Sequence, residues 1–134
     1  VAPPESTMAR GSAVPEGADP MGLEKLGNIA RVDLGPRDGG CTFSLNAQEL
    51  LLAGAPDDEA VKGKGVVRIG GELINLTAEN GGLGAIYAGP TMTAQGVTVK
   101  VVPAAGNDAM RTADLYVAAD GKQRKFAGGQ WACG

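Results

Sequence analysis

Short runs in which apolar and polar residues alternate are the strongest constraint on what this chain can fold into. At 41–45, 97–101 and 113–117 every second side chain is apolar, as expected for a strand with one buried face. The 22 glycines of the 134-residue chain are scattered between such runs, and glycine is unfavourable inside helices but common in turns. The sequence therefore predicts an all-β domain.

Two glycine-containing dipeptides predict local hairpins. Gly70-Gly71 separates strand-like segments at 66–69 and 72–78, and Asp120-Gly121 precedes a return strand at 122–127. Both dipeptides readily adopt the positive φ angles of two-residue hairpin turns. In all, about eight to ten short, hairpin-connected strands are expected, which is typical of an antiparallel β-barrel or sandwich.

The segments between these strands are expected to be irregular. Residues 55–65 predict a polar loop in which Asp57 could cap one helical turn, and residues 80–84 predict another turn. Gly128-Gly129 is expected to break the return strand, so that the last residues would form a separate short strand. A further strand is predicted at about 29–34.

The N-terminal segment differs in composition from the rest of the chain. Residues 1–20 are rich in Pro, Ala, Ser, Glu and Gly and carry almost no large apolar side chains. Such a segment buries too little apolar surface to offset the entropy cost of ordering, so we expect an arm or tether followed by a single β-domain over 21–134. The chain begins Val-Ala-Pro-Pro, which we interpret as the start of a mature product after removal of a targeting segment.

The two cysteines, Cys41 and Cys133, lie at the two ends of the predicted β-structure. A redox pair is more often spaced as Cys-x-x-Cys, and zinc needs about four ligands where this chain has two distant cysteines and no histidine. We therefore favour a disulfide over a reactive thiol pair or a metal site. A disulfide is typical of small exported domains.

Composition excludes several functions. With 12 basic and 15 acidic residues and a net charge of -3, the chain offers no concentrated positive charge for nucleic acid. No apolar stretch approaches the roughly 18–20 residues that span a bilayer. The acidic run 57–59 lacks the spacing of a calcium loop. No histidine, cofactor motif or catalytic set is present, so we predict a non-enzymatic protein without a metal or cofactor.

Two groups of residues are candidates for binding. The return strand of the last hairpin carries Lys122, Arg124 and Lys125 beside Phe126; these cations could meet an anionic partner, or they could serve only to prevent strand edges from aggregating. Tyr87 follows a glycine-rich loop and is the aromatic residue we expect to be exposed, whereas core packing is the natural role of Trp131.

Three elements of the sequence together resemble a known family: the early and late cysteines, the string Gly84-Ala85-Ile86-Tyr87, and the string Gln95-Gly96-Val97. Residues 41–133 resemble the periplasmic, often lipid-anchored inhibitors of C-type lysozyme found in Gram-negative bacteria. The first string is similar to the tail of that family's Ser-Gly-x-x-Tyr motif, and the second falls near its Lys-Gly motif. Leu83 and Gln95 stand where the family has its serine and lysine.

The resemblance implies a small β-barrel closed by a disulfide, a protein partner in the cell envelope, and a periplasmic, outer-membrane-anchored or secreted location. Under this reading Tyr87 and Gln95 belong to the binding surface. The alternatives are a carrier barrel that holds a small apolar ligand in its lumen, or a structural lipoprotein. The side chains expected to line that lumen are Ile69, Leu73, Val99 and Leu115.

Overall fold

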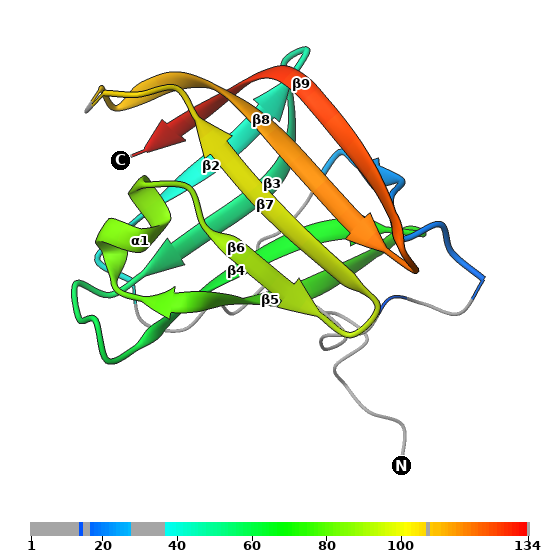
Figure 1. Cartoon of the computed structure of the whole chain (residues 1–134), viewed down its shortest axis with the longest axis horizontal. Coiled ribbons are helices and arrows are strands. Elements are labelled where there is room, and N and C mark those ends of the chain that lie inside the picture. Colours follow the sequence, from blue (N-terminus) through cyan, green and yellow to red (C-terminus); the bar gives the residue numbers. More distant parts are fainter. Residues whose placement is uncertain (1–13, 15–16, 28–36, 107, 134) are drawn as a thin grey trace.

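The computed structural model describes residue 14 and residues 17–27, 37–106 and 108–133. Most of this part of the chain is antiparallel β-structure (Figure 1). Its elements, in chain order, are β1 (Leu23–Glu24), β2 (Gly39–Leu45), β3 (Gln48–Ala55), β4 (Lys62–Ile69), β5 (Glu72–Gly81), α1 (Leu83–Tyr87), β6 (Thr91–Ala94), β7 (Val97–Pro103), β8 (Met110–Ala119) and β9 (Lys122–Cys133). No helix within these ranges is long and apolar enough to span a bilayer.

Eight of the strands form a closed up-and-down barrel. Each strand from β2 to β8 pairs antiparallel with the next strand along the chain, and β9 pairs with β2 to complete the ring. The ninth strand, β1, pairs with the final residues of β4. The structure confirms the prediction of an all-β, hairpin-connected fold and selects the barrel over the sandwich.

The barrel has two different ends. The turn end carries the short hairpin connections, including Gly70-Gly71 and Asp120-Gly121, whose φ angles lie between 54° and 83° as the sequence predicts. The loop end carries the longer connections at 56–61, 82–90 and 104–109. The two cysteines, Cys41 in β2 and Cys133 in β9, also lie towards the loop end.

The barrel interior is a packed apolar core. Alternate side chains of every strand from β2 to β9 point inward and form one cluster, whose largest fully buried members include Trp131, Phe43 and Leu51. Of the four side chains expected to line a lumen, Ile69, Val99 and Leu115 belong to this core. Leu73 does not, because it lies on the outer face, where it packs against Leu26 and Val66.

Both ends of the core are covered. At the loop end α1 buries Ile86 completely, and the Ile86 carbonyl accepts a hydrogen bond of 3.1 Å from the Trp131 indole N–H. At the turn end Val14 and Met21 pack against the core, and the Val14 N–H donates to the Gln95 carbonyl at 3.0 Å. These contacts involve part of the predicted N-terminal arm, and the boundary between arm and domain stays a prediction.

The predicted break at Gly128-Gly129 is wrong, because β9 runs through both glycines. Gly128, with φ 78°, forms a bulge opposite Asp114, where the register of β8 and β9 shifts. A Cβ atom on Gly129 would collide with the Phe43 ring and the Ser44 carbonyl. Glycine at 129 therefore allows β9 to cross the core closely instead of ending the strand.

The predicted loop at 55–65 is also too long. β4 begins at Lys62, and Gly63 and Gly65 are buried within it. A Cβ atom on Gly63 would lie 2.7 Å from the Ile86 Cδ1 atom, so glycine is needed where α1 descends onto the strand. Asp57 caps no helical turn; its N–H donates to the Asp38 carboxylate at 2.7 Å.

The predicted turn at 80–84 is wrong in detail. β5 continues to Gly81, and α1 begins at Leu83 after Gly82, whose φ is 91°. Five residues are too few for a helical periodicity to be visible in the sequence. The strand predicted at about 29–34 lies outside the described residues.

The predicted disulfide is present and joins the two strands that close the barrel. Cys41 and Cys133 are direct cross-strand partners in the β2–β9 ladder, and their sulfur atoms are 2.05 Å apart. They are 92 residues apart in the sequence. Among the described residues there is no free cysteine. The bond therefore holds β9 against β2 where the ring is completed.

Replacing Cys133 with serine should lower the melting temperature by more than about ten degrees. A bridge that closes a loop of this length is worth about 4–5 kcal/mol, chiefly by restricting the unfolded chain. Thermal unfolding followed by circular dichroism measures the change, and a Cys41→Ser, Cys133→Ser double variant should match the single one. An unchanged melting temperature would contradict the stabilising role of the bond.

Gly129→Ala should destabilise the barrel by about 1–3 kcal/mol, because the new methyl group must displace the Phe43 ring or the β2 backbone. Gly84→Ala is the matched control: it lies in α1, its Cβ atom would meet nothing within 4 Å, and alanine favours the helix. The control should be neutral or slightly stabilising. Denaturant titration of both variants compares their free energies of unfolding; equal effects would refute the close-approach explanation.

Candidate functional site

The structure does not bring the predicted binding residues together. Tyr87 ends α1 at the loop end, whereas Gln95 lies in the β6–β7 turn at the turn end. Lys122 and Arg124 also lie at the turn end, in the first residues of β9, and Lys125 points outward from the same strand. Tyr87 and Gln95 therefore cannot belong to one compact site.

The basic strand makes contacts within its own chain. The Arg124 guanidinium stacks over the Phe126 ring, 4.4 Å from its centroid, and donates to the Met21 carbonyl at 3.3 Å. Arg124 thereby connects β9 to the N-terminal segment that covers the turn end. It therefore has a structural role besides any role in binding a partner.

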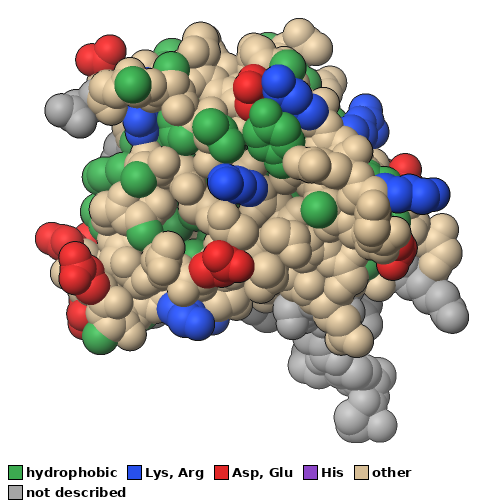
Figure 2. Space-filling view, viewed as in Figure 1, with side chains coloured by type: hydrophobic (Ala, Val, Ile, Leu, Met, Phe, Trp, Pro, Cys, Tyr) green, Lys and Arg blue, Asp and Glu red, His purple; other side chains and the backbone are tan. Residues whose placement is uncertain are grey.

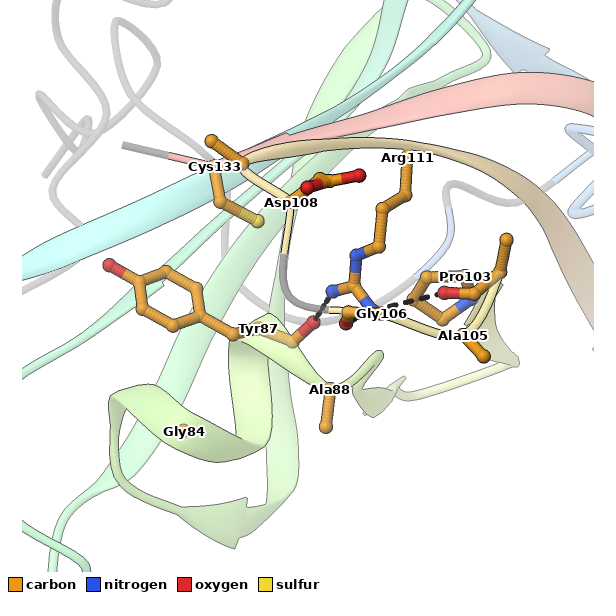
Figure 3. A pocket seen from close by; sticks show the side chains of 11 residues that line it. Gly84, Tyr87, Ala88, Pro103, Ala105, Gly106, Asp108, Arg111 and Cys133 are labelled. Carbon is orange, nitrogen blue, oxygen red and sulfur yellow. Dashed lines mark hydrogen bonds between the residues drawn. The ribbon is translucent and has the colours of Figure 1, made fainter.

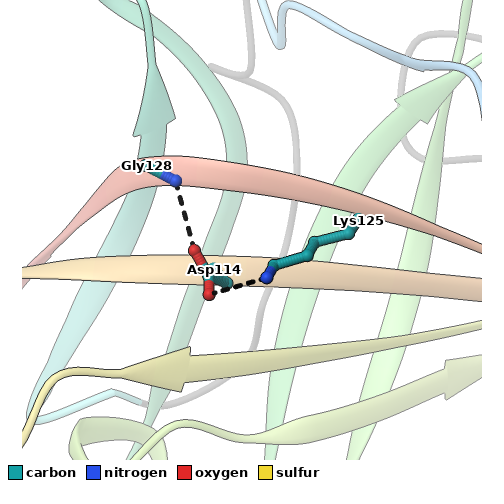
Figure 4. Close-up of polar contacts among 3 residues, drawn as sticks. All are labelled: Asp114, Lys125 and Gly128. Carbon is teal, nitrogen blue, oxygen red and sulfur yellow. Dashed lines mark hydrogen bonds and ion pairs between the residues drawn. The ribbon is translucent and has the colours of Figure 1, made fainter.

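Lys125 has its own partners on the outer face. Its ammonium group lies 3.6 Å from an Asp114 carboxylate oxygen (Figure 4) and 5.7 Å from the centroid of the Tyr116 ring. Tyr116 first, and then Asp114, raises the pKa of Lys125 above its ordinary value. Asp114 also accepts a 3.1 Å hydrogen bond from the Gly128 N–H, so the ion pair is built onto the bulge in β9.

The outer surface carries mixed charge. On the face seen in Figure 2, acidic and basic side chains lie interspersed among uncharged ones. Such a surface lacks the continuous positive field that a nucleic acid requires. A pocket is therefore a better candidate for a binding site than the charged surface of this face.

A pocket of about 620 Å³ opens at the loop end, between α1 and the β7–β8 loop (Figure 3). Its volume lies within the usual range of small-ligand sites, about 300–1,000 Å³. The residues that line it are Gly84, Tyr87, Ala88, Pro103, Ala104, Ala105, Gly106, Asp108, Ala109, Arg111 and Cys133. Tyr87 is the one predicted binding residue among them, but the prediction that it is exposed is wrong, because its side chain is half-buried and packs against the core.

The local backbone explains how Tyr87 reaches this pocket. α1 ends at Tyr87, and Gly89, with φ 101°, turns the chain sharply into β6. A Cβ atom at this glycine would collide with the Val101 carbonyl and the Pro103 ring. Only glycine therefore allows the end of α1 to pack against the end of β7, where the two elements form one side of the pocket.

Arg111 organises the pocket. Its Nη1 atom donates to the carbonyl oxygens of Ala104 and Gly106, each at 3.1 Å, and its Nη2 atom donates to the Tyr87 carbonyl. One guanidinium thus holds both the β7–β8 loop and the end of α1. The planar fork of an arginine suits three acceptors in fixed directions better than the ammonium of a lysine would.

The sequence-based reasoning missed Arg111, although a signal for it exists. In β8 the odd-numbered residues 113, 115 and 117 point inward and are buried. Arg111 continues that series, so an arginine stands in a position that the alternation assigns to the interior. A charged residue on the buried side of a strand is unusual enough to be examined as a functional or cross-linking group.

The remaining walls of the loop-end pocket are largely apolar. Ala88, Pro103 and Ala109 supply apolar surface, and Asp108 places an exposed carboxylate at the same pocket. Within the described ranges no cluster of three or more His, Cys, Asp or Glu side chains could hold a metal ion. The arrangement offers charged groups and apolar surface for recognition of a ligand.

Arg111→Met should release the β7–β8 loop from α1, because it removes three hydrogen bonds while keeping an apolar stem. We expect a loss of about 1–2 kcal/mol in the free energy of unfolding, together with faster amide hydrogen exchange at Ala104 and Cys133. Arg124→Met is the matched control and should cost less, because it removes one hydrogen bond. Unaltered exchange at both amides would show that Arg111 does not hold the loop.

A scan against models of protein families and searches of curated proteins and of solved structures found no match to this chain. The resemblance to the lysozyme inhibitors therefore stays a prediction. What the barrel binds has to be argued from its own residues.

Proposed function

We propose that this chain is a non-enzymatic binding domain of the cell envelope and that it recognises a protein partner through its loop end. The observation that carries the proposal is the pocket formed by Tyr87, Arg111 and the β7–β8 loop. Binding sites are disproportionately found on loops that a rigid scaffold positions. Here the scaffold is a closed barrel, and the disulfide lies next to the pocket because Cys133 lines it.

The disulfide supports an oxidising compartment. Disulfides of this structural kind persist in exported proteins and are rare in the cytosol. Periplasmic residence, attachment to an outer membrane or secretion are all compatible with this argument. The resemblance to envelope proteins favours the same locations.

The packed interior supports binding at the surface over carriage of a ligand in the lumen. A carrier needs a cavity among inward-facing side chains. Here the inward-facing residues form one buried cluster, and both ends of that cluster are covered. The end formed by longer loops is therefore a better binding site than the barrel lumen.

Inhibition of a lysozyme-like hydrolase is the most specific version of this proposal. Tyr87 and Leu83 are four residues apart in α1 and both are half-buried against the core, so a partner that covers α1 contacts their exposed parts together. Gln95 cannot join them, because the seven-residue strand β7 separates the turn that holds Gln95 from the pocket, a span of about 20 Å. An inhibitor built on this barrel would rely on α1 and its neighbouring loops.

Site-specific crosslinking tests the proposal. A photoreactive residue at Ala105, on the rim of the pocket, should capture a discrete partner in envelope extract, and Tyr87→Ala should weaken that capture about tenfold or more. The control carries the photoreactive residue at Gln123, on the outer face near the turn end. Identical captures at both positions, or none at Ala105, would refute binding at the loop end.

A direct assay tests the inhibitor version. Purified barrel is added to a C-type lysozyme, and lysis of bacterial cell walls is followed by turbidity. Inhibition that Tyr87→Ala abolishes and Gln95→Ala leaves intact would support it. Full lysozyme activity at a large molar excess of the barrel would exclude this version and leave the broader proposal to the crosslinking result.

A further inference from the structure

We propose that the loop-end pocket binds a carboxylate group that is flanked by an amide N–H, and that Arg111 receives the carboxylate. This chemistry occurs at the C-terminal residue of a peptide and in a free N-acylated amino acid. The proposal rests on the proposed function, because it identifies the group that a partner would insert at the loop end. Its support comes from charge, hydrogen bonding and the shape of the pocket.

Arg111 carries a positive charge that forms no ion pair among the described residues. The guanidinium is partly buried, and its hydrogen-bond acceptors are three backbone carbonyl oxygens. The ion pair found within the described residues joins Lys125 to Asp114 and does not involve Arg111. Neutral carbonyl groups orient a guanidinium without neutralising it, so Arg111 keeps its positive charge. An anionic ligand would supply the missing counter-charge.

Arg111 leaves part of its hydrogen-bonding capacity unused. A guanidinium has five N–H groups, and three of them are donated to the carbonyl oxygens. The Nε atom is buried and has no hydrogen-bond partner among the described residues. The unused N–H groups belong to Nε and Nη2, the neighbouring nitrogens that bind a carboxylate in the two-point mode. A buried donor without an acceptor is costly, and because Nε has almost no accessible surface, a two-point contact requires a small shift of the Arg111 side chain that gives this donor an acceptor.

The same pocket also holds a negative charge, the carboxylate of Asp108. Asp108 lines the pocket but forms no ion pair with Arg111. A carboxylate there repels a dianionic phosphate and can accept a hydrogen bond from an N–H group. The apolar walls formed by Ala88, Pro103 and Ala109 suit a small apolar side chain beside these polar groups. One anionic group, one N–H donor and a small apolar side chain together describe a terminal amino-acid residue.

The view in Figure 3 agrees with this division of the pocket. The Arg111 guanidinium lies between the Tyr87 carbonyl and Pro103, and no ion pair joins it to Asp108. A ligand that touches both Arg111 and Asp108 therefore presents a hydrogen-bond acceptor to one residue and a donor to the other. A single inorganic anion would satisfy Arg111 alone.

Titration with matched neutral and anionic ligands tests the proposal on the wild-type protein. N-acetylalanine and N-acetylalaninamide differ only in the carboxylate, and each is added while the amide resonances are followed by two-dimensional NMR. The carboxylate should bind about tenfold or more tightly, with the largest shifts at Gly106, Ala109 and Tyr87. Equal affinities, or shifts centred on Lys122 and Lys125, would overturn the proposal.

A second set of ligands distinguishes a peptide C-terminus from a free acylated amino acid as the source of the carboxylate. A tetrapeptide with a free C-terminus is compared with N-acetylalanine and with its own C-terminal amide. Tighter binding of the free tetrapeptide supports a peptide terminus, and equal binding of the tetrapeptide and N-acetylalanine supports a free acylated amino acid. Inorganic phosphate is titrated in parallel, and tighter binding of phosphate than of either carboxylate would refute the role of Asp108.

Variants assign the effect to Arg111. Arg111→Lys keeps the charge but loses the planar fork, so it should reduce affinity for the carboxylate about tenfold and affinity for the amide much less, while Lys122→Gln, which removes a positive charge at the turn end, should change neither. Because Arg111→Lys also loosens the loop, Asp108→Asn provides a second variant. It should strengthen binding of acetate, which has no N–H to donate, by relieving repulsion. Weaker acetate binding by Asp108→Asn would contradict the assigned geometry.

The outcomes separate this inference from the proposed function. If Ala105 captures a partner but acid and amide bind equally, the carboxylate site is wrong and loop-end binding stands. If the carboxylate is selected but Ala105 captures no partner, the pocket is a small-acid site and the proposed protein partner is wrong.

Discussion

The pairing of β9 with β2 is the interaction on which the rest of the structure depends. It completes the ring of eight strands, and the disulfide between Cys41 and Cys133 holds it in place. The same ladder brings Trp131 opposite Phe43 inside the core. The Trp131 indole then donates to the Ile86 carbonyl and fixes α1 across the loop end. Since α1 carries Tyr87, the geometry of the candidate pocket follows from the closure of the barrel.

Each end of the barrel is tied by an arginine that donates to a backbone carbonyl. At the loop end Arg111 holds the last residue of α1, and at the turn end Arg124 reaches the Met21 carbonyl of the N-terminal segment. The two arginines differ in what they leave available. Arg124 stacks on Phe126, while Arg111 lines an open pocket and has an Nε–H group without a partner in the described part of the chain. That difference, which charge counting along the sequence does not reveal, favours the loop end as the site of binding.

The strands could be predicted where their periodicity is local. The alternation at 41–45, 97–101 and 113–117 lies within β2, β7 and β8, and the turns at Gly70-Gly71 and Asp120-Gly121 have the expected positive φ angles. The failures occur at glycines whose role depends on distant neighbours. Gly63 makes room for Ile86 and Gly129 makes room for Phe43, so both glycines continue strands that local rules would end.

The sequence by itself determined the fold class, the hairpins and the pairing of the two cysteines, because alternation, turn conformation and a cysteine count are local or compositional properties. Only the tertiary structure decided that the strands close into a barrel, that residues 83–87 form a helix, and that Tyr87 and Gln95 lie at opposite ends. It also decided that the Arg111 guanidinium donates to the carbonyl of Tyr87, which is 24 positions away in the sequence. Such juxtapositions depend on strand register and on packing between residues far apart in the chain, and no local pattern encodes them.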